Sequence, residues 1–555
     1  MLSNSIIIDY GLRDFDICLE QPVLWHYIKI AFIISYIGSS TFIFNSLYSI
    51  FSNTFKRLKS KTKKPKNKKH TKFKWNLPSL IENSSYNFTL FIGVNENSEK
   101  IIIDEKSLYQ NILITGTIGT GKTSSAMYPF TKQLISYNAE DFSSKIGLLI
   151  LDVKGNYYKK VKEFAEISNR KSDLIVLELG GYYKYNPLHK PNLKANVIAN
   201  RLKTILLLFS KNNSESYWID KAEQVLSECI KLCRLYNNNY VTFEEIHKLV
   251  TIDSYYLEKV QYLRELFKLN KFNKEDIYNL LSALNFFDKE YCNLDFRTKS
   301  ILKSEITRIT NTFISDYNIY STFCPKEEDL NFFGFEDVIN SGKIVVLNMN
   351  ISEYQDLSKI IATYLKLDFQ TEALIRLSKC NMEKERTIAF ISDEYHEYCT
   401  ASDANFFAQS RESKCINIVA TQSYSSLLNA VNDESTVKVI IQNLVNKLWF
   451  RTDDIFTIEN AQKQIGKEDK EKISKSISEN AQSTIYSYFS NSLNSKDSNI
   501  SESLNTYLQY DFIYDTNYFT QKLENFTCLS FLSDGNKILK PQKVKLFPYF
   551  KNPGL

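Results

Sequence analysis

The amino-acid sequence predicts an α/β fold with a doubly wound parallel sheet, and three observations carry this prediction. Residues 111–123 (NILITGTIGTGKT) run from a short apolar strand through a glycine-rich turn into a helix. Residues 146–155 and 172–180 are mainly apolar runs, typical of parallel strands that are buried on both faces. Helical segments alternate with these strands, which favours crossover helices packed on one sheet. Asp152 and Lys154 end the first run, at the edge where open α/β sheets bind ligands.

The glycine-rich turn matches the phosphate-binding loop pattern G-x-x-x-x-G-K-[ST], from Gly116 to Thr123. In this pattern backbone N–H groups point at a phosphate, the lysine reaches the β- and γ-phosphates, and the threonine hydroxyl ligates Mg²⁺. The strand before the loop and the helix after it distinguish the match from a chance glycine-rich turn. The residues that we predict to bind the nucleotide are Gly116, Thr117, Ile118, Gly119, Thr120, Gly121, Lys122, Thr123 and Ser124.

The composition is that of a globular protein with several domains. Of 555 residues, 43% are apolar and 24% are charged, and this length corresponds to two to four domains. The nine cysteines are scattered without a C-x-x-C pair and there are only five histidines. This pattern argues against a disulfide framework or a zinc module, and it favours a reducing compartment for the soluble part of the chain.

Residues 30–55 contain no charged side chain and are longer than the about 20 residues that a transmembrane helix needs. Trp25, Tyr27 and Tyr48 suit a membrane–water interface. A buried core helix or a signal peptide is the alternative interpretation. The run is too long for a typical signal peptide and no small-residue cleavage site follows it. We therefore expect a transmembrane helix at 30–55, with residues 1–29 outside the cytoplasm.

Residues 56–74 (KRLKSKTKKPKNKKHTKFK) follow at once and contain no acidic residue. Positive charge marks the cytoplasmic end of a membrane span, so we expect a basic juxtamembrane linker at 56–75 with the rest of the chain in the cytoplasm. The tract can also bind anionic lipid or nucleic acid. Membrane topology alone is sufficient to explain it.

A second candidate site lies in residues 387–398 (TIAFISDEYHEY), where an apolar strand runs into Asp393 and Glu394. This is the shape of a Walker B strand: Asp393 can ligate Mg²⁺, and Glu394 can accept a proton from the attacking water. Alone, such a pair is usually a solvated strand end, but the phosphate loop favours the functional interpretation. Further on, Gln422 follows another apolar strand and can sense the γ-phosphate. Arg411 is a candidate arginine finger, although an exposed helix arginine is its ordinary interpretation.

Residues 191–330 carry apolar side chains at helical spacing and predict a mostly helical insertion between the two nucleotide-site motifs. Four aromatic residues there can stack on bases, but at this spacing they more often pack in a core: Tyr255, Tyr256, Tyr262 and Phe267. Residues 474–505 are rich in Ser and Asn and predict a loop. Residues 507–549 predict short strands that close the domain.

Taken together, these pieces resemble a conjugative coupling protein, the TraG/TraD-type membrane ATPase of type IV secretion systems. Besides GTIGTGKT, the resemblance rests on the order and spacing of LDVKGNYY, YNPL, SYWIDKAEQVL, INSGKIVVLNM, ISDEY and ATQS. It covers nearly everything after the basic linker. Two features depart from the family pattern. Many members have two N-terminal transmembrane helices where this chain shows one, and LDVKG replaces the commoner DPKG.

The resemblance implies a RecA-like P-loop NTPase motor of the FtsK/HerA class, built from residues 76–190 and 331–555, with an all-α insertion domain at 191–330. It implies ATP and Mg²⁺ as cofactors, with Thr123 and Asp393 as metal ligands. The family's catalytic roles fall on Lys122 and Glu394, and by similar position on Arg411 and Gln422. The resemblance implies three kinds of partner: single-stranded DNA with a bound relaxase, the proteins of the secretion channel, and membrane lipid. The implied assembly is a homo-hexamer in the bacterial inner membrane.

We therefore expect a membrane-anchored ATPase that couples ATP hydrolysis to the transfer of DNA or nucleoprotein through a type IV secretion system. Two alternatives remain open at this point: an FtsK/HerA-like DNA translocase for chromosome or plasmid partition, and a non-hydrolysing membrane scaffold that recruits secretion substrates. The complete Lys, Thr, Asp and Glu set argues against the scaffold, because nucleotide binding alone does not need Glu394.

Overall fold

The computed structural model describes residue 30 and residues 88–550, except 153, 209–215, 350, 380–381, 383–384 and 480–499. The chain divides into two compact units, Met1–Ser84 and Ser85–Leu555. The segments expected at 1–29, 30–55 and 56–75 lie outside the described residues, save for Ile30. Within the described ranges, no helix combines the length and the apolar character that a membrane crossing requires.

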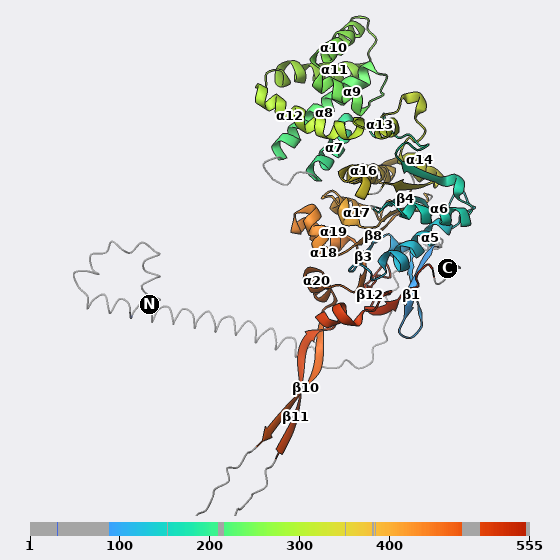
Figure 1. Ribbon diagram of the computed structural model, residues 1–555, viewed down its shortest axis with the longest axis vertical. Helices are drawn as coiled ribbons and strands as arrows, with labels where there is room; N and C mark the ends of the chain where they lie inside the picture. The colour runs from blue at the N-terminus through green and yellow to red at the C-terminus, as the bar shows by residue number, and fades with distance from the viewer. Residues whose placement is uncertain are drawn as a thin grey trace, which may run out of the picture. The chain divides into compact units, whose positions relative to one another are not determined.

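A large sheet forms the centre of the second unit (Figure 1). Its strands are β1 Thr89–Asn95, β2 Lys100–Asp104, β3 Ile112–Thr115, β4 Gly147–Leu151, β5 Leu174–Glu178, β6 Ile344–Asn348, β7 Ile388–Ser392, β8 Cys415–Thr421, β9 Asn446–Phe450, β12 Thr527–Phe531 and β13 Gln542–Lys545. In the described part of the chain these 11 strands follow the order β2-β1-β13-β12-β9-β3-β8-β7-β4-β6-β5.

The sheet is mixed. The strands from β9 to β5 in this order are all parallel to one another. The other edge, β2-β1-β13-β12, is antiparallel and joins the parallel part through β12 and β9. The predicted α/β fold is therefore confirmed, with an antiparallel edge added to the expected parallel sheet.

Helices cover both faces of the parallel strands because those strands are apolar on both faces. In β4, Leu149 and Leu151 belong to one core and Leu148 and Ile150 to the other, as the alternation of strand side chains requires. One face packs against η3 Lys122–Met127, α5 Tyr128–Ser136 and α6 Tyr157–Ile167. The opposite face packs against α16 Asp356–Lys379, α17 Asp403–Gln409, α18 Tyr424–Val431 and α19 Glu434–Asn443.

The described part of the chain from Ala195 to Phe323, between β5 and β6, is mainly helical, and Figure 1 shows these helices grouped together in green. They are α7 Ala195–Leu208, α8 Ser216–Tyr236, α9 Phe243–Thr251, α10 Asp253–Lys268, α11 Lys274–Asn285, η6 Phe286–Tyr291, α12 Phe296–Ile314 and α13 Tyr317–Phe323. In this group Tyr255 and Tyr256 pack against the core, whereas the side chains of Tyr262 and Phe267 are exposed.

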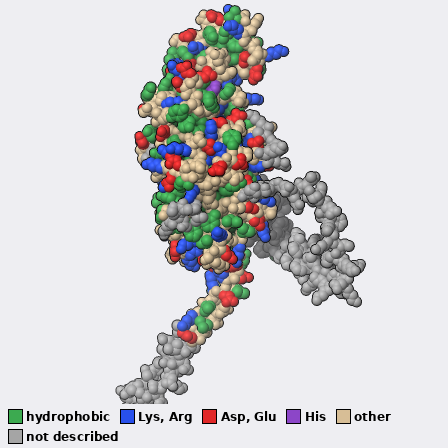
Figure 2. All heavy atoms as spheres, turned by 90° about the vertical axis from the view of Figure 1, so that its right-hand side faces the viewer, with side chains coloured by type: hydrophobic (Ala, Val, Ile, Leu, Met, Phe, Trp, Pro, Cys, Tyr) green, Lys and Arg blue, Asp and Glu red, His purple; other side chains and the backbone are tan. Residues whose placement is uncertain are grey.

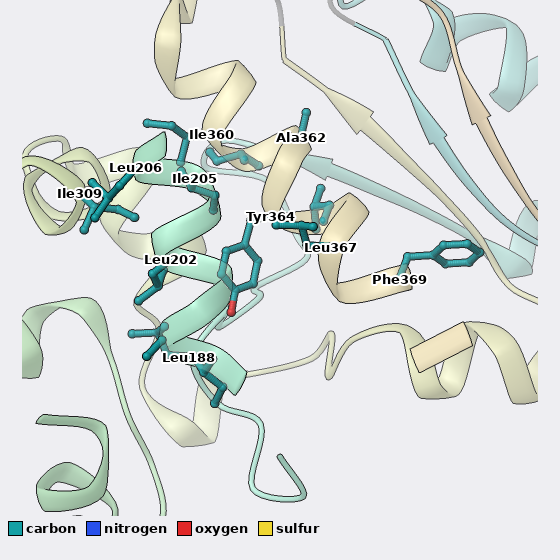
Figure 3. Packing of buried hydrophobic residues seen from close by; sticks show 14 of the residues in the cluster. Leu188, Leu202, Ile205, Leu206, Ile309, Ile360, Ala362, Tyr364, Leu367 and Phe369 are labelled. Carbon is teal, nitrogen blue, oxygen red and sulfur yellow. The ribbon is translucent and has the colours of Figure 1, made fainter. Parts of the chain in front are cut away.

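Helix α16 attaches the helical group to the sheet. Figure 3 shows Leu202 and Ile205 of α7 beside Tyr364 of α16, whose hydroxyl donates to the carbonyl of Pro187 at 2.6 Å. The buried carboxylate of Asp368, one turn along α16, pairs with Lys190 at 2.6 Å and Arg201 at 2.7 Å. Because both cations are also buried, removing either one leaves Asp368 with an uncompensated share of charge.

The shorter helical segments connect these elements. They are α4 Glu105–Leu108, η4 Lys171–Asp173, η7 Glu327–Asp329, α14 Phe335–Ser341, α15 Ile351–Tyr354, η8 Tyr395–Glu397, α20 Ile455–Ile465 and η9 Tyr518–Lys522. Gly342 ends α14 with a left-handed backbone (φ 67°), and β6 begins two residues later.

Two long strands, β10 Lys467–Glu479 and β11 Ile500–Phe512, form a separate antiparallel ribbon that extends beyond α20 (Figure 1). The loop expected at 474–505 is therefore wrong at both of its ends, where Ser474 pairs with Asn505 in the ribbon. Serine and asparagine dominate the composition there, but contacts between the two strands, such as the diagonal ion pair of Lys475 with Glu502, join them in a ribbon. Residues 480–499 lie outside the described part.

Candidate nucleotide-binding site

The phosphate loop lies at the carboxyl edge of β3 and is held by the ends of neighbouring strands. The N–H of Gly116 donates to the carbonyl of Gln422 at 3.2 Å, and that of Thr117 to Arg451 at 2.9 Å. From the other side, the N–H of Phe526 donates to the carbonyl of Thr120 at 3.0 Å. The loop is thus shaped by β8, β9 and the segment before β12.

Two loop glycines are required by close packing. A Cβ on Gly116 would lie 2.6 Å from the Cβ of Phe450, and one on Gly121 would lie 2.4 Å from the ring of Phe526. Gly121 also has a left-handed backbone, with φ 97°, which side chains rarely adopt. The opposite, outer side of the loop is open, since a Cβ on Gly119 would meet nothing within 4 Å.

Lys122 begins η3 and folds back over the loop. Its ammonium donates to the carbonyl oxygens of Gly116 and Thr117, the latter at 3.1 Å. Burial lowers the pKa of Lys122, against the opposing charges of Glu394 and Asp393. An ammonium that spans the loop in this way lies where a phosphate bound in the cradle would meet it.

The acidic pair follows β7, and Asp393 faces the phosphate loop. The Thr123 hydroxyl donates to Asp393 Oδ2 at 2.8 Å, so the two predicted Mg²⁺ ligands are direct neighbours. The Asp393 backbone is fixed by the carbonyl of Leu151 at 3.1 Å and by the Tyr398 hydroxyl at 2.6 Å. Burial raises the pKa of Asp393 to about 6, and the charge of Asp152 adds to the effect.

Glu394 has a left-handed backbone with φ 50°, which costs a non-glycine residue about 1–3 kcal/mol and is concentrated at functional sites. Its carboxylate accepts from Lys154 Nζ at 2.9 Å and from Gln422 Nε2 at 3.3 Å. Burial acts to raise the pKa of Glu394, but the Lys154 ammonium outweighs it and holds the pKa below its ordinary value. Glu394 is therefore ionised at neutral pH, as a general base must be.

The donor set fits a magnesium nucleotide. Thr123 and Asp393 offer hard oxygen ligands, and Mg²⁺ at nucleotides is held by one or two such ligands together with phosphates. The described residues contain no group of three or more His, Cys, Asp or Glu side chains that could hold a metal alone. The open loop, Lys122 and this ligand pair together suit a bound triphosphate.

The structure brings Lys122, Thr123, Asp393, Glu394 and Gln422 together at one edge of the sheet. It does not bring Arg411 to them. Arg411 lies exposed in the turn between α17 and β8, at the amino end of the strand whose carboxyl end leads to Gln422. A strand of 7 residues separates the two by about 23 Å.

Lys154 was noted in the sequence only as a residue at a strand end, and its contact with Glu394 was missed. The contact depends on β4 lying next to β7, where Leu151 pairs with Ser392. Sequence order places these strands more than 200 residues apart, so no local signal reveals the pairing. His396 was also missed: its Nδ1 lies 3.2 Å from the Thr421 hydroxyl and 3.9 Å from Glu394.

A phosphate loop and an acidic strand end at the carboxyl edge of parallel strands are typical of the P-loop NTPase-like fold. Comparison with known families is more specific. Residues 309–501 match the family described as the type IV secretion-system coupling protein DNA-binding domain. A search of curated proteins gives no match.

Solved coupling-protein structures share the fold. The bacterial conjugative coupling protein TrwBdeltaN70, in an unbound form, is similar at 13% identity over 82% of this chain and 89% of that chain, with a TM-score of 0.55. The plasmid coupling protein TrwB in complex with ADP and Mg²⁺ is similar at 12% identity over 80% and 86%, with a TM-score of 0.52. The complex of TrwB with the non-hydrolysable GTP analogue GDPNP is similar at 13% identity over 80% of this chain and 87% of that chain, with a TM-score of 0.53. With the family match, the resemblance to type IV coupling proteins is confirmed.

Proposed function

We propose that this protein is a membrane-anchored ATPase that couples ATP hydrolysis to the transfer of DNA through a type IV secretion system. One observation carries the proposal: Lys122, Thr123, Asp393, Glu394 and Gln422 converge at one sheet edge in a chain that resembles coupling proteins. The solved TrwB complexes with ADP and Mg²⁺ and with non-hydrolysable nucleotide analogues support nucleotide and magnesium binding.

Each residue at the site has a role that its contacts allow. Lys122 exchanges its two carbonyl partners for the β- and γ-phosphates, and Thr123 and Asp393 provide oxygen ligands for Mg²⁺. Glu394 accepts a proton from the attacking water, and Gln422, bonded to the same carboxylate, helps to orient that water. Bound Mg·ATP supplies the phosphoanhydride bond that the water cleaves to give ADP and phosphate.

The cargo and the partners follow from the same proposal. We infer that the cargo is single-stranded DNA with a bound relaxase, delivered to channel proteins of the secretion system. The DNA-binding family match at 309–501 supports this inference; it includes β6, β7, β8, β9 and β10 and ends at the start of β11. The proposed assembly is a homo-hexamer, anchored in the inner membrane by residues 30–55.

The first prediction separates nucleotide binding from hydrolysis. Lys122→Ala should abolish both Mg·ATP binding and hydrolysis, because it removes the cation that meets the phosphates. Glu394→Gln should keep Mg·ATP binding and lower kcat by at least about 100-fold, the value of a positioned general base. Binding of a fluorescent ATP analogue and phosphate release, each with and without single-stranded DNA, measure the two effects.

These measurements, together with assays of plasmid transfer and partition, decide between the alternative functions. A wild-type protein that binds Mg·ATP but releases no phosphate, with or without DNA, would support the non-hydrolysing scaffold. Normal plasmid transfer by the Lys122→Ala protein would contradict the proposal of a DNA-transfer motor. If this variant loses plasmid transfer but keeps normal plasmid partition, the protein is not a partition translocase. Membrane insertion of Lys122→Ala serves as the control for correct production.

A further inference from the structure

An ion pair at the edge of the site joins a residue without an assigned role to the proposed general base. The Lys154 Nζ lies 2.9 Å from Glu394 Oε1. The Lys154 side chain is 50% exposed whereas that of Glu394 is 11% exposed. A lysine that extends from solvent toward a nearly buried carboxylate gives up hydration and side-chain freedom, so the contact needs a structural reason.

The loop that carries Lys154 is built to present it. The buried Asp152 carboxylate accepts the N–H groups of Lys154 at 3.0 Å and of Asn156 and Tyr157 at 3.2 Å each. These bonds fix the turn between β4 and α6. Gly155 completes the turn with a left-handed backbone, φ 64°. These bonds, together with the contact to Glu394, hold Lys154 beside the end of β7.

Glu394 needs such a partner. Its left-handed backbone is strained, and a general base must hold its oxygen within about 2.6–3.2 Å of the oxygen whose proton it accepts. Lys154 holds one carboxylate oxygen, and the amide of Gln422 holds the other at 3.3 Å. Lys122, by contrast, sits on the phosphate loop and bonds to loop carbonyls. The two lysines therefore serve different groups.

We propose that Lys154 is a positioning residue for ATP hydrolysis: its ammonium holds the Glu394 carboxylate in the orientation from which it accepts the proton of the attacking water. This inference rests on the proposed function. It assigns a role to the lysine of the LDVKG segment, which is not one of the predicted nucleotide-binding residues. Lys154 acts through Glu394 and need not touch the nucleotide.

Steady-state ATPase kinetics of the full chain test this role. Lys154→Met should lower kcat by at least about tenfold, a part of the 10²–10⁴ that a positioned base contributes, with KM for Mg·ATP changed by less than about twofold. Lys154→Arg should recover most of kcat, because it restores the cation. Lys463→Met is the matched control: it removes a lysine from an exposed ion pair with Glu459, 3.1 Å long, on α20.

Hydrogen–deuterium exchange of the full-length protein tests the contact without relying on hydrolysis. In Lys154→Met the peptide covering residues 393–398 should exchange faster than in the wild type, while the phosphate-loop peptide at 111–123 should not change. In a Glu394→Gln background, where the ion pair is already lost, Lys154→Met should add little. Unchanged exchange across 393–398 overturns the inference even if the wild type is an active ATPase.

The remaining outcomes are also decisive. A rise in KM with kcat preserved would mean that Lys154 binds the phosphates directly, and the positioning role would be wrong. An equal loss of kcat in Lys154→Met and Lys154→Arg would also overturn it. A wild type without ATPase activity overturns the proposed function itself, while the exchange data still report whether Lys154 orders Glu394.

Discussion

Lys447, in β9, is a buried cation whose hydrogen-bond partners among the described residues are backbone carbonyl groups and no carboxylate. Its ammonium donates to the carbonyl oxygens of Leu444 at 2.9 Å and Val445 at 3.4 Å, at the end of α19. Burial lowers the pKa of Lys447 to about 8. Between pH 8 and 10.5 the unfolded chain therefore binds more protons than the folded chain, and the linkage relation makes stability rise with pH in this window.

Lys447→Met should remove this pH dependence. Below pH 8 the burial of the charge costs the wild type on the order of 3 kcal/mol, and this cost is lost as pH rises toward 10.5. The difference in melting temperature between Lys447→Met and the wild type should thus shift steadily in favour of the wild type from pH 8 to 10. Thermal unfolding across that range measures it, with exposed Lys463→Met as a control expected to be flat. A constant difference would contradict the assignment.

At the level of elements, strand order explains which part of the site the sequence could predict. Lys122, Asp393 and Gln422 each follow an apolar strand or lie in a known motif, so their place at a sheet edge is readable locally. Which strands lie next to each other in the sheet cannot be predicted from these local patterns. The order β3-β8-β7-β4 decides that Gln422 and Lys154 meet Glu394, and this order arises from packing between segments distant in sequence.

The same limit explains the error at the ribbon. Its strands were hidden because strand preference depends on cross-strand partners, which composition does not show. The helical insertion, by contrast, was readable, since helical periodicity is a local signal. The antiparallel edge formed by β1, β2, β12 and β13 was only partly foreseen: short strands were expected at 507–549, where β12 and β13 lie, but not their place beside β9.

The β10–β11 ribbon is a separate sheet, and the residue before β10 lies beside the residue after β11. Ile513 N–H donates to the carbonyl of Gly466 at 3.2 Å, so the chain can be rejoined there through a short Gly-Ser linker. We expect deletion of residues 467–512, with this linker in their place, to leave Mg·ATP binding and the melting temperature nearly unchanged. The strands of the ribbon pair with each other and not with the main sheet. Analogue binding and thermal unfolding check this. Loss of binding in the deleted protein would show that the ribbon supports the phosphate loop.

At the scale of the whole molecule, the positive charge is concentrated in the predicted linker. The chain carries a formal net charge of +6, and the linker sequence at 56–74 contains more than this excess. The remaining residues are therefore net negative. On the face that Figure 2 presents, basic and acidic side chains of the described residues are interspersed. Non-specific attraction to DNA or anionic lipid is thus expected chiefly from the linker.

Arg411 has a role only if the protein assembles. It is exposed at the amino edge of β8, whereas the nucleotide-site residues of its own chain lie at the carboxyl edge. In a head-to-tail ring the two edges can meet across a subunit boundary. We therefore expect Arg411→Ala to lose ATP hydrolysis while it keeps Mg·ATP binding, because its own phosphate loop is intact.

Mixing subunits tests this directly. Lys122→Ala subunits keep Arg411, and Arg411→Ala subunits keep a working phosphate loop, so each can complete the other. A random one-to-one mixture of two inactive proteins should recover about a quarter of the wild-type rate if each site takes its arginine from one neighbour. Phosphate release measures the recovery, and co-purification through two different tags verifies mixed assembly. Mixed assemblies without recovered hydrolysis would show that Arg411 does not act across the boundary.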